Sequence, residues 1–530
     1  MRGGRLVIAK ANELVSLDPL LASDGPSERI VTSQIYETLV AADPVTGEIK
    51  PSLARWTVSS DGRTYVFEIA PDAVWSDGRP IIAEDVVTSV KALARSKTAS
   101  TGGRGGVGRI EGYGDYRAGR ATTIKGLVAE ERRLTMRLDG VFCPIFSFLL
   151  LTPPLPTHVF GRYLSDGDPS KNTDGVAEHA APPVASGPFV FGAWRHGEEI
   201  VLRANERYWR GRPYLDELAF RLTDVTKATE AFRTGALDLA WTESFRWGDA
   251  LRDLASDSSF RVVRTPSPGY SFIGWNTRSQ TAPALQDKRI RQALAYGLDA
   301  DLAMQRLLLG EGVRTHQHMD PTSWAYTPGL NEYPYDPAKA ESLIRSAGYS
   351  KGADGIYQKD GRALSFTLVT NAGNDLRTKV IQFATDQYGA IGVHVTPKLV
   401  DFKEFSDRVL AGDPSVEAFV LGWAWSTDPF GSAVWQLPTT PGASHGGLVN
   451  YDDPEVGAAI DAGRFGPDCG ISARRRAYDT LNRRLNEDQP YNFLFTPNVI
   501  FLMSARVRGV VPGPYVPMPD SHLWWLAPQK

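Results

Sequence analysis

The sequence predicts an α/β protein with more than one domain. Its 530 residues exceed the length of one compact core, since a typical domain holds about 100–200 residues. Strand-like and helix-like segments alternate along the second half, which indicates right-handed crossovers and a mainly parallel sheet. The first half is more mixed, and the Pro/Gly-rich stretch 264–270 between the halves predicts a domain crossing.

The first half contains several short strands and two helices. Short apolar runs or strict alternation predict strands at 5–9, 64–69, 133–138, 199–205 and 217–222. Segment 83–96 carries apolar residues at helical spacing and predicts a helix, which a Gly-rich loop over 102–119 follows. Residues 227–241 predict a helix, a turn at Gly235 and a strand.

The second half begins with two helices that have recognisable first residues. Segments 287–299 and 336–349 have apolar positions at helical spacing. Asp287 and Asp336 precede them and can accept amide protons of the first turn, and Gly348 ends the second helix.

A strand–helix alternation then leads to a segment rich in tryptophan. The predicted strands are 364–368, 393–395 and 417–421, and the predicted helices between them are 375–389 and 402–411. In open sheets of this kind, ligands bind beyond the carboxyl ends of the strands. The segment LGWAWSTDPFGSAVWQL (421–437) begins where the third strand ends, so its position predicts a functional loop.

The composition is that of an ordinary globular protein. Hydrophobic residues make up 42% and charged residues 22%, and the net charge of -3 gives no reason to expect nucleic acid or an anionic membrane as partner. With 50 Gly, 36 Pro and 13 Trp, we expect long loops with large aromatic side chains, which suit a concave binding site. No apolar run has the length of a transmembrane helix or a signal peptide, so we expect a cytosolic protein or a mature form without its export signal.

The two cysteines, Cys143 and Cys469, are far apart in the sequence. Two cysteines are too few for a disulfide framework, and their spacing matches no zinc motif. The sequence therefore leaves open both the redox compartment and whether these cysteines are free.

Three motifs in the sequence resemble catalytic, cofactor or metal sites. Residues 103–108 match G-x-G-x-x-G, but a helix precedes them where the dinucleotide motif requires a strand. Residues 442–446 match G-x-S-x-G around Ser444, but a proline-bearing loop precedes them, so a serine hydrolase is a disfavoured alternative. His316 and His318 lack a third ligand and are expected to face solvent. We predict no catalytic residue, no cofactor and no metal site.

The aromatic residues are the strongest candidates for a binding surface. These candidates, with one neighbouring asparagine, are Tyr270, Trp275, Asn276, Trp423, Trp425 and Trp435. Aromatic rings suit pockets for peptides, sugars or aromatic solutes, and core packing is an equally weighted alternative. Trp425 is favoured as ligand-facing because Ser426 and Asp428 are nearby, whereas Trp423 is expected to be packed.

Residues 51–90 resemble family 5 of the extracytoplasmic solute-binding proteins, which serve ABC importers of peptides, nickel and opines. The resemblance rests on an ordered set of short motifs: Ala54, Trp56, Ser60-Asp61-Gly62, Tyr65/Phe67, Asp77-Gly78 and the AEDV of residues 83–86. Further similar segments are 16–24, 185–218, 274–299 and 450–464. Motifs in this order along most of the chain are far more specific than any single motif.

The resemblance implies a two-lobed, hinged α/β fold of the periplasmic-binding-protein class (type II, cluster C-like). Residues 1–268 would form lobe one, with an extra subdomain at about 50–180, and residues 497–530 would return to it. Residues 269–496 would form lobe two, and the two crossings between the lobes would be the hinge. Ligand bound between the lobes would stabilise the closed state that a membrane permease recognises.

The resemblance also implies the substrate-binding component of an ABC importer, not an enzyme. We expect it to capture a solute, with an oligopeptide as the leading ligand class, and to deliver it to permease subunits in the membrane. An oligosaccharide or sugar conjugate is the alternative ligand, and nickel is less favoured because no histidine cluster exists. The protein would be a monomer in the periplasm or a lipoprotein on the cell surface.

The site residues that the resemblance implies include one ambiguous acid. In peptide-binding relatives, the loop after the Gly-Trp pair supplies an aspartate that holds the peptide α-amino group. Here that loop is a residue shorter, and Asp428 belongs to an Asp-Pro pair, so it either contacts ligand or braces the loop. Ser23, Asp24 and Asn371 complete the predicted ligand-binding set.

Overall fold

The computed structural model describes most of the chain. The described residues are 2–14, 16, 17, 19, 30–96, 106–164, 181–223, 225–247, 250–425, 427–429, 434, 435 and 447–528. Over these ranges, no helix has both the length and the apolar character needed to cross a bilayer.

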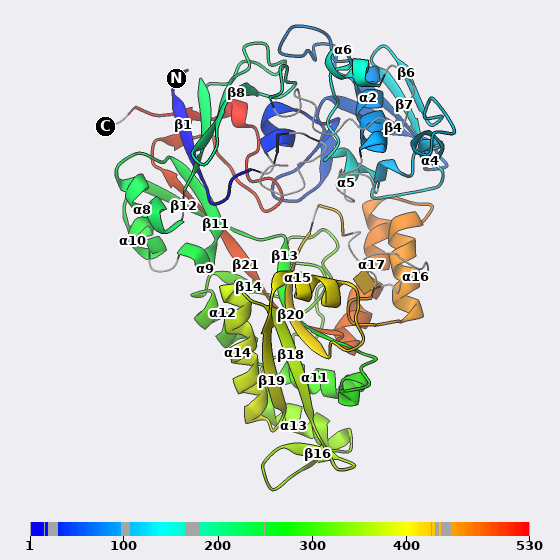
Figure 1. The fold of residues 1–530 in the computed structure, drawn as a ribbon, viewed down its shortest axis with the longest axis vertical. Coiled ribbons are helices and arrows are strands. Elements are labelled where there is room, and N and C mark those ends of the chain that lie inside the picture. The colour runs from blue at the N-terminus through cyan, green and yellow to red at the C-terminus, as the bar shows by residue number, and fades with distance from the viewer. Residues whose placement is uncertain are drawn as a thin grey trace.

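The buried apolar side chains divide the chain into two parts. One group comes from residues 6–263 and 499–526, and the other from residues 270–495. We call these parts the first lobe and the second lobe; they form the upper and lower parts of the molecule in Figure 1. The two-lobed α/β fold that the resemblance implied is therefore present, and the exact limits 1–268, 269–496 and 497–530 stay a prediction.

A single sheet of 12 strands runs through both lobes, and β21 (Tyr491–Ser504) is the strand that joins them. Its first half pairs with β13 (Gly269–Trp275) and β14 (Gly312–Arg314) of the second lobe. Its second half pairs with β11 (Leu239–Glu243) and β12 (Phe260–Pro266) of the first lobe.

The first lobe continues this sheet and adds a smaller second sheet with its own helices, which we call the subdomain. The remaining strands of the large sheet here are β1 (Arg5–Lys10), β8 (Phe189–Arg195), β9 (Glu199–Ala204) and β10 (Glu217–Leu222), with helices α8 (Val225–Arg233), α9 (Ser244–Trp247) and α10 (Ala250–Ser256). The subdomain sheet has the order β4 (Ala54–Val58), β5 (Thr64–Ile69), β7 (Arg133–Arg137) and β6 (Leu127–Glu130). It carries helices α2 (Ala83–Arg95), α4 (Tyr113–Arg117), α5 (Ile145–Leu149) and α6 (Thr157–Phe160).

Short elements complete both lobes. The first lobe contains β2 (Val40–Ala42), β3 (Ile49–Pro51), β22 (Val507–Arg508) and β23 (Trp525–Leu526). The second contains β15 (Ser350–Lys351), β16 (Tyr357–Lys359) and β17 (Arg362–Ala363).

The second lobe has its own set of helices, which cover its part of the large sheet. They are α11 (Lys288–Tyr296), α12 (Ala300–Leu307), α13 (Pro337–Ser346), α14 (Asp375–Ala390), α15 (Phe402–Phe405), α16 (Pro454–Phe465) and α17 (Ile471–Asp488). Asp287 and Asp336 accept backbone N–H groups of the first turns of α11 and α13, as predicted. The predicted helix 402–411 is α15 followed by a π-helical turn.

The parallel pairing predicted for the strand–helix run is confirmed, but the sheet of the second lobe as a whole is mixed. β18 (Ser365–Asn371) pairs in parallel with β19 (His394–Val400) and β20 (Ala418–Ala424), as their crossover helices require. However, β13 is antiparallel to both β20 and β21. The reason is that β13 and β21 run in opposite directions between the lobes, which the local helix–strand pattern does not encode.

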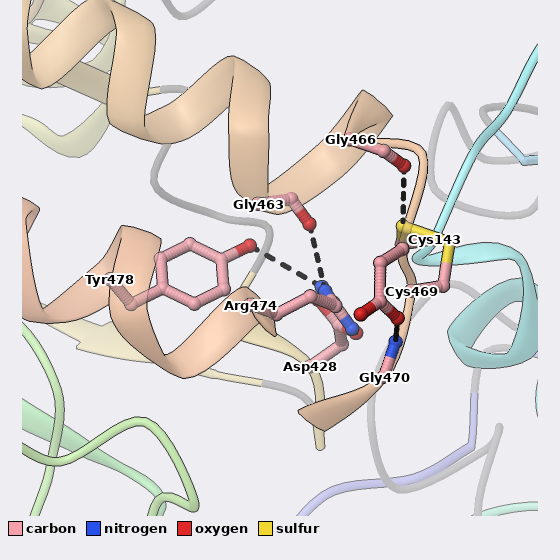
Figure 2. Close-up of a disulfide and its surroundings, with 9 residues drawn as sticks. Cys143, Asp428, Gly463, Gly466, Cys469, Gly470, Arg474 and Tyr478 are labelled. Atoms are coloured by element: carbon pink, nitrogen blue, oxygen red, sulfur yellow. Dashed lines mark hydrogen bonds and ion pairs between the residues drawn. A yellow bond between two sulfur atoms is a disulfide. The ribbon is translucent and has the colours of Figure 1, made fainter. Parts of the chain in front are cut away.

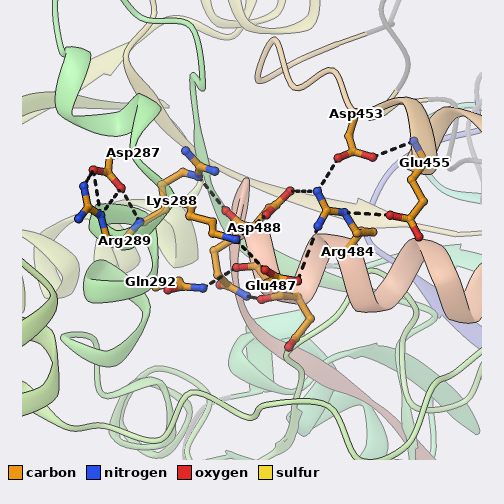
Figure 3. Close-up of polar contacts among 12 residues, drawn as sticks. Asp287, Lys288, Arg289, Gln292, Asp453, Glu455, Arg484, Glu487 and Asp488 are labelled. Atoms are coloured by element: carbon orange, nitrogen blue, oxygen red, sulfur yellow. Dashed lines mark hydrogen bonds and ion pairs between the residues drawn. The ribbon is translucent and has the colours of Figure 1, made fainter. Parts of the chain in front are cut away.

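Ion pairs fix α17 against the rest of the second lobe. Lys288 of α11 lies 2.6 Å from Glu487, and Arg484 lies 2.6 Å from Asp453 and 3.2 Å from Asp488 (Figure 3). The exposed pairs of such a network contribute little individually, but together they restrict the orientation of a helix. This helix carries the arginine that lies in the cavity described next.

Candidate functional site

A cavity of about 620 Å³ lies between the lobes. The first-lobe wall comes from β5, the end of β4 and the segment leading into α5, and includes Ser59, Ser60, Tyr65, Cys143, Phe146 and Ser147. The second-lobe wall includes Trp324, Thr427, Asp428, Cys469 and Arg474. This volume falls in the range of small-ligand pockets. Because both lobes contribute walls, an occupant that fills the cavity contacts both.

Aromatic rings line the cavity on both lobes. On the first lobe, Phe146 packs with its ring centre 5.6 Å from that of Tyr65 and 4.8 Å from that of Trp56. On the second lobe, the indole N–H of Trp324 donates to the Thr427 carbonyl at 3.2 Å. These contacts hold the rings in place, so that they offer fixed apolar area to a ligand.

Asp428 is held by a buried arginine. The Arg474 guanidinium donates to both carboxylate oxygens, at 2.6 and 2.7 Å, and its Nε donates to the Gly463 carbonyl at 2.7 Å (Figure 2). The guanidinium carbon also lies 5.1 Å from the centre of the Trp324 ring. Asp428 is 8% and Arg474 6% exposed. Bidentate geometry of this kind is the strongest form of such a pair.

The pair cancels its own charge inside the cavity wall. Burial opposes the charge on Arg474, but the adjacent Asp428 carboxylate outweighs it and raises the pKa of the guanidinium. Burial, followed by the same carboxylate, raises the pKa of Tyr478 to about 12. Asp428 thus anchors the loop to α17 through Arg474, while still lining the cavity.

The two cysteines form a disulfide across the cavity. Cys143 and Cys469 have Cα atoms 5.1 Å apart, although they are separated by 326 positions in sequence. Cys143 directly precedes α5 of the first lobe, and Cys469 lies between α16 and α17 of the second (Figure 2). The question of whether the cysteines are free is therefore answered by a covalent link between the lobes.

The other predicted aromatic residues lie in a buried cluster of the second lobe. Tyr270 is buried, with its hydroxyl 2.7 Å from Nδ1 of His318. Trp425 is half-buried, with its ring centre 5.0 Å from that of His318, and Trp435 is 1% exposed. Trp423 lies nearly parallel to Phe272, at 6.2 Å. The ligand contact predicted for Trp425 stays a prediction.

The prediction that His316 and His318 face solvent was wrong. Their exposed fractions are 8% and 1%. The segment that holds them is buried throughout, because Gln317 between them pairs with the backbone of Thr327 through both ends of its amide. Burial lowers the pKa of His318 to about 3, so this imidazole is neutral at pH 7. Over the described ranges, no three His, Cys, Asp or Glu side chains form a group that could hold a metal ion.

Three residues that were predicted to bind ligand make hydrogen bonds within the second lobe and do not line the cavity. Trp275 is fully buried and donates from its indole to Asn492 at 3.0 Å. Asn276 donates to the carbonyls of Pro414 and Val416. Asn371 accepts from Arg377 at 2.6 Å and donates to the Ala372 carbonyl. Among the predicted residues that the structure describes, Asp428 alone lines the cavity.

Some predictions fall outside the described residues. They concern Ser23, Asp24, Ser426 and Ser444, and residues 103–105 of the glycine-rich motif. The ligand contacts proposed for the first three and the disfavoured hydrolase role of Ser444 stay predictions.

Sequence reasoning missed Trp324, Tyr65, Phe146 and Arg474. For Arg474 a signal existed: it stands in helical register with Tyr478, Leu481 and Leu485 on the buried face of α17. An arginine on an apolar helix face requires a buried acceptor, which predicts an acidic partner.

Comparison with known proteins identifies the family. The model of the bacterial extracellular solute-binding proteins, family 5 Middle, matches residues 48–444. The oligopeptide-binding protein AppA of Bacillus subtilis is 27% identical over 549 aligned positions, covering 99% of this chain and 92% of that protein.

Solved structures show the same fold. AppA from Bacillus subtilis in complex with a nonapeptide aligns with a TM-score of 0.73 at 24% identity, covering 99% of both chains. NikZ from Campylobacter jejuni in complex with Ni(L-His) aligns with a TM-score of 0.74 at 22% identity, covering 98% of this chain and 99% of that one. The family predicted from the sequence is confirmed: the chain belongs to the bacterial extracellular solute-binding proteins of family 5.

Proposed function

We propose that the protein is the substrate-binding component of an ABC importer and that an oligopeptide binds in the cavity between its lobes. The observation that carries this proposal is the cavity of about 620 Å³ with walls from both lobes, in a chain of this family. The Bacillus subtilis relative is named for oligopeptide binding and was solved with a nonapeptide. A ligand that contacts both lobes favours the closed state over the open state, which is the signal a permease would recognise.

The chemistry of the walls suits a peptide. Trp324, Tyr65 and Phe146 offer apolar faces, and Ser59 and Ser60 offer hydroxyl groups. The charges of the Asp428–Arg474 pair are already satisfied by each other. The described wall therefore suits apolar side chains and neutral amide groups more than a ligand that needs one strong counter-ion.

The disulfide supports a location outside the cytoplasm. Disulfides persist in oxidising compartments, such as the bacterial periplasm and the cell surface. The Cys143–Cys469 bond agrees with the family's extracellular designation. We infer a monomer in the periplasm or a surface lipoprotein, with permease subunits as the membrane partner.

Native mass spectrometry with three ligand pools tests the proposal. The purified protein is mixed with a tryptic peptide pool, with an oligosaccharide pool, or with Ni(II) and L-histidine. We expect adducts with peptide masses at one peptide per protein and none with the other two pools. Binding of oligosaccharides or of the nickel complex without peptides would overturn the ligand assignment.

Replacing Trp324 with alanine is expected to weaken binding of the tryptic peptides about tenfold or more, since a buried aromatic contact contributes about 1–2 kcal/mol or above to binding. The measurement is the adduct fraction over a range of peptide concentrations. Trp194→Ala is the matched control: this half-buried tryptophan stacks on His196, and it does not line the cavity. Equal losses in both variants would show a general effect of removing an indole.

A further inference from the structure

The Cys143–Cys469 disulfide joins the lobes away from the hinge. The backbone passes between the lobes at residues 267–268 and again along β21. In Figure 1 these crossings lie to one side of α5, α16 and α17, which meet at the right of the molecule. The disulfide lies at that second meeting point and lines the cavity, so a covalent bond links the lobes there in addition to the two backbone crossings.

Non-covalent contacts between the lobes surround the bond. The backbone N–H of Cys143 donates to the Arg464 carbonyl at 2.8 Å. The ring of Phe142 lies 5.9 Å from that of Phe465, and the Arg109 guanidinium lies 6.0 and 5.6 Å from these two ring centres. Each of these non-covalent contacts is weak and Phe465 is 37% exposed, so the disulfide is the strongest link among the described residues at this place.

We propose that this disulfide is a clasp that limits the opening of the cavity, and that its reduction frees the lobes to separate. A hinged protein opens when the side of the cavity opposite the hinge widens. With the Cα atoms of Cys143 and Cys469 held 5.1 Å apart, that side cannot widen. Ligand exchange would then depend on the thiol–disulfide state, a consequence that rests on the proposed function.

The reduction is ordinary exchange with a dithiol. A thiolate of the dithiol attacks Sγ of Cys469, forms a mixed disulfide and releases the Cys143 thiolate, which takes up a proton. The second thiol of the reductant then displaces Cys469, so two electrons and two protons pass to the protein and the reductant leaves as its disulfide. Cys469 is the accessible side because it is half-exposed, whereas Cys143 is 5% exposed.

Small-angle X-ray scattering of the ligand-free protein tests the clasp without any ligand. Thiol titration of the denatured oxidised protein is expected to find no free thiol before reduction and two after it. Oxidised wild type is expected to show one compact particle. Dithiothreitol is expected to shift its radius of gyration to a larger value.

Cysteine variants separate loss of the bond from other effects of the reductant. We expect the variants Cys143→Ser, Cys469→Ser and the double variant to have the radius of gyration of reduced wild type. Dithiothreitol is expected to leave this radius unchanged. Circular dichroism checks that each variant is folded. Two free thiols in the native protein, or equal radii for oxidised wild type and the double variant, would overturn the clasp.

The consequence for binding is measured separately. Exchange of bound tryptic peptides for isotope-labelled copies, followed by native mass spectrometry, is expected to be faster after reduction. If reduction increases the radius of gyration but no peptide adduct forms, the proposal of a clasp is supported and the proposal of a peptide ligand is rejected. Peptide exchange at equal rates in both states would reject control of ligand exchange by the clasp.

Discussion

Replacing Arg474 with methionine is expected to lower the free energy of unfolding by about 3–5 kcal/mol, because it removes the cation that pairs with both oxygens of the buried Asp428 carboxylate. Methionine keeps much of the side-chain volume, so the loss reports the charge rather than a cavity. Arg474 donates a short hydrogen bond to each carboxylate oxygen of Asp428, and both bonds are lost in this variant. Chemical denaturation followed by tryptophan fluorescence measures the change.

Two further variants identify the cause. Arg476→Met, which removes an exposed arginine of the same helix, is expected to change stability by less than about 0.5 kcal/mol. The double variant Asp428→Leu with Arg474→Met is expected to recover much of the loss, since an apolar pair leaves no buried charge. If the double variant is as unstable as Arg474→Met alone, packing rather than charge explains the effect.

Acid is expected to destabilise the protein through His318. The unfolded state binds a proton to this imidazole near pH 6.5, whereas burial keeps the pKa in the folded state at about 3. The contribution of His318 to the free energy of unfolding is therefore fully present above pH 6.5, and it is lost as the pH falls from 6.5 towards 3. At pH 4.5 the loss amounts to about 2–3 kcal/mol, at about 1.4 kcal/mol for each pH unit.

The comparison of wild type with His318→Asn isolates this contribution. Asparagine can place an acceptor near the position of Nδ1, which pairs with the Tyr270 hydroxyl, and it does not titrate. We expect the fall in unfolding free energy between pH 6.5 and 4.5 to be shallower in this variant by about 2–3 kcal/mol. Burial also raises the pKa of the Asp320 carboxyl, but this group is present in both proteins, so the comparison of their slopes isolates His318. His394→Asn changes an exposed imidazole and should follow wild type; equal slopes in wild type and His318→Asn would contradict the prediction.

Local sequence patterns predicted the elements well because each depends on nearby residues. Asp287 and Asp336 start helices through contacts two or three positions along the chain. The direction of β13 against β20 depends instead on how two lobes share a sheet, and local patterns do not encode it. The resemblance predicted the two-lobed fold because it used the order of motifs along the whole chain.

The candidate site was only partly predictable, since its walls come from segments that are distant in sequence. Asp428 was singled out by its neighbours, but its partner Arg474 lies 46 positions away. The sequence around a tryptophan does not show whether its side chain packs in the core or lines a cavity. Trp275 is fully buried, whereas Trp324 lines the cavity. The cysteines allowed one intramolecular pairing, but only the fold shows that it links two lobes.

β21 changes its pairing partners where it passes from the second lobe to the first, and this affects how the lobes can move relative to each other. Its pairing passes from Phe495 opposite Ser271 to Asn498 opposite Pro266, with Pro497 between them. Proline has no N–H to donate, so the ladder lacks one donor at the place where the strand changes lobes. Motion between the lobes therefore bends a continuous sheet, and the bend meets least resistance at Pro497, where one hydrogen-bond donor is absent.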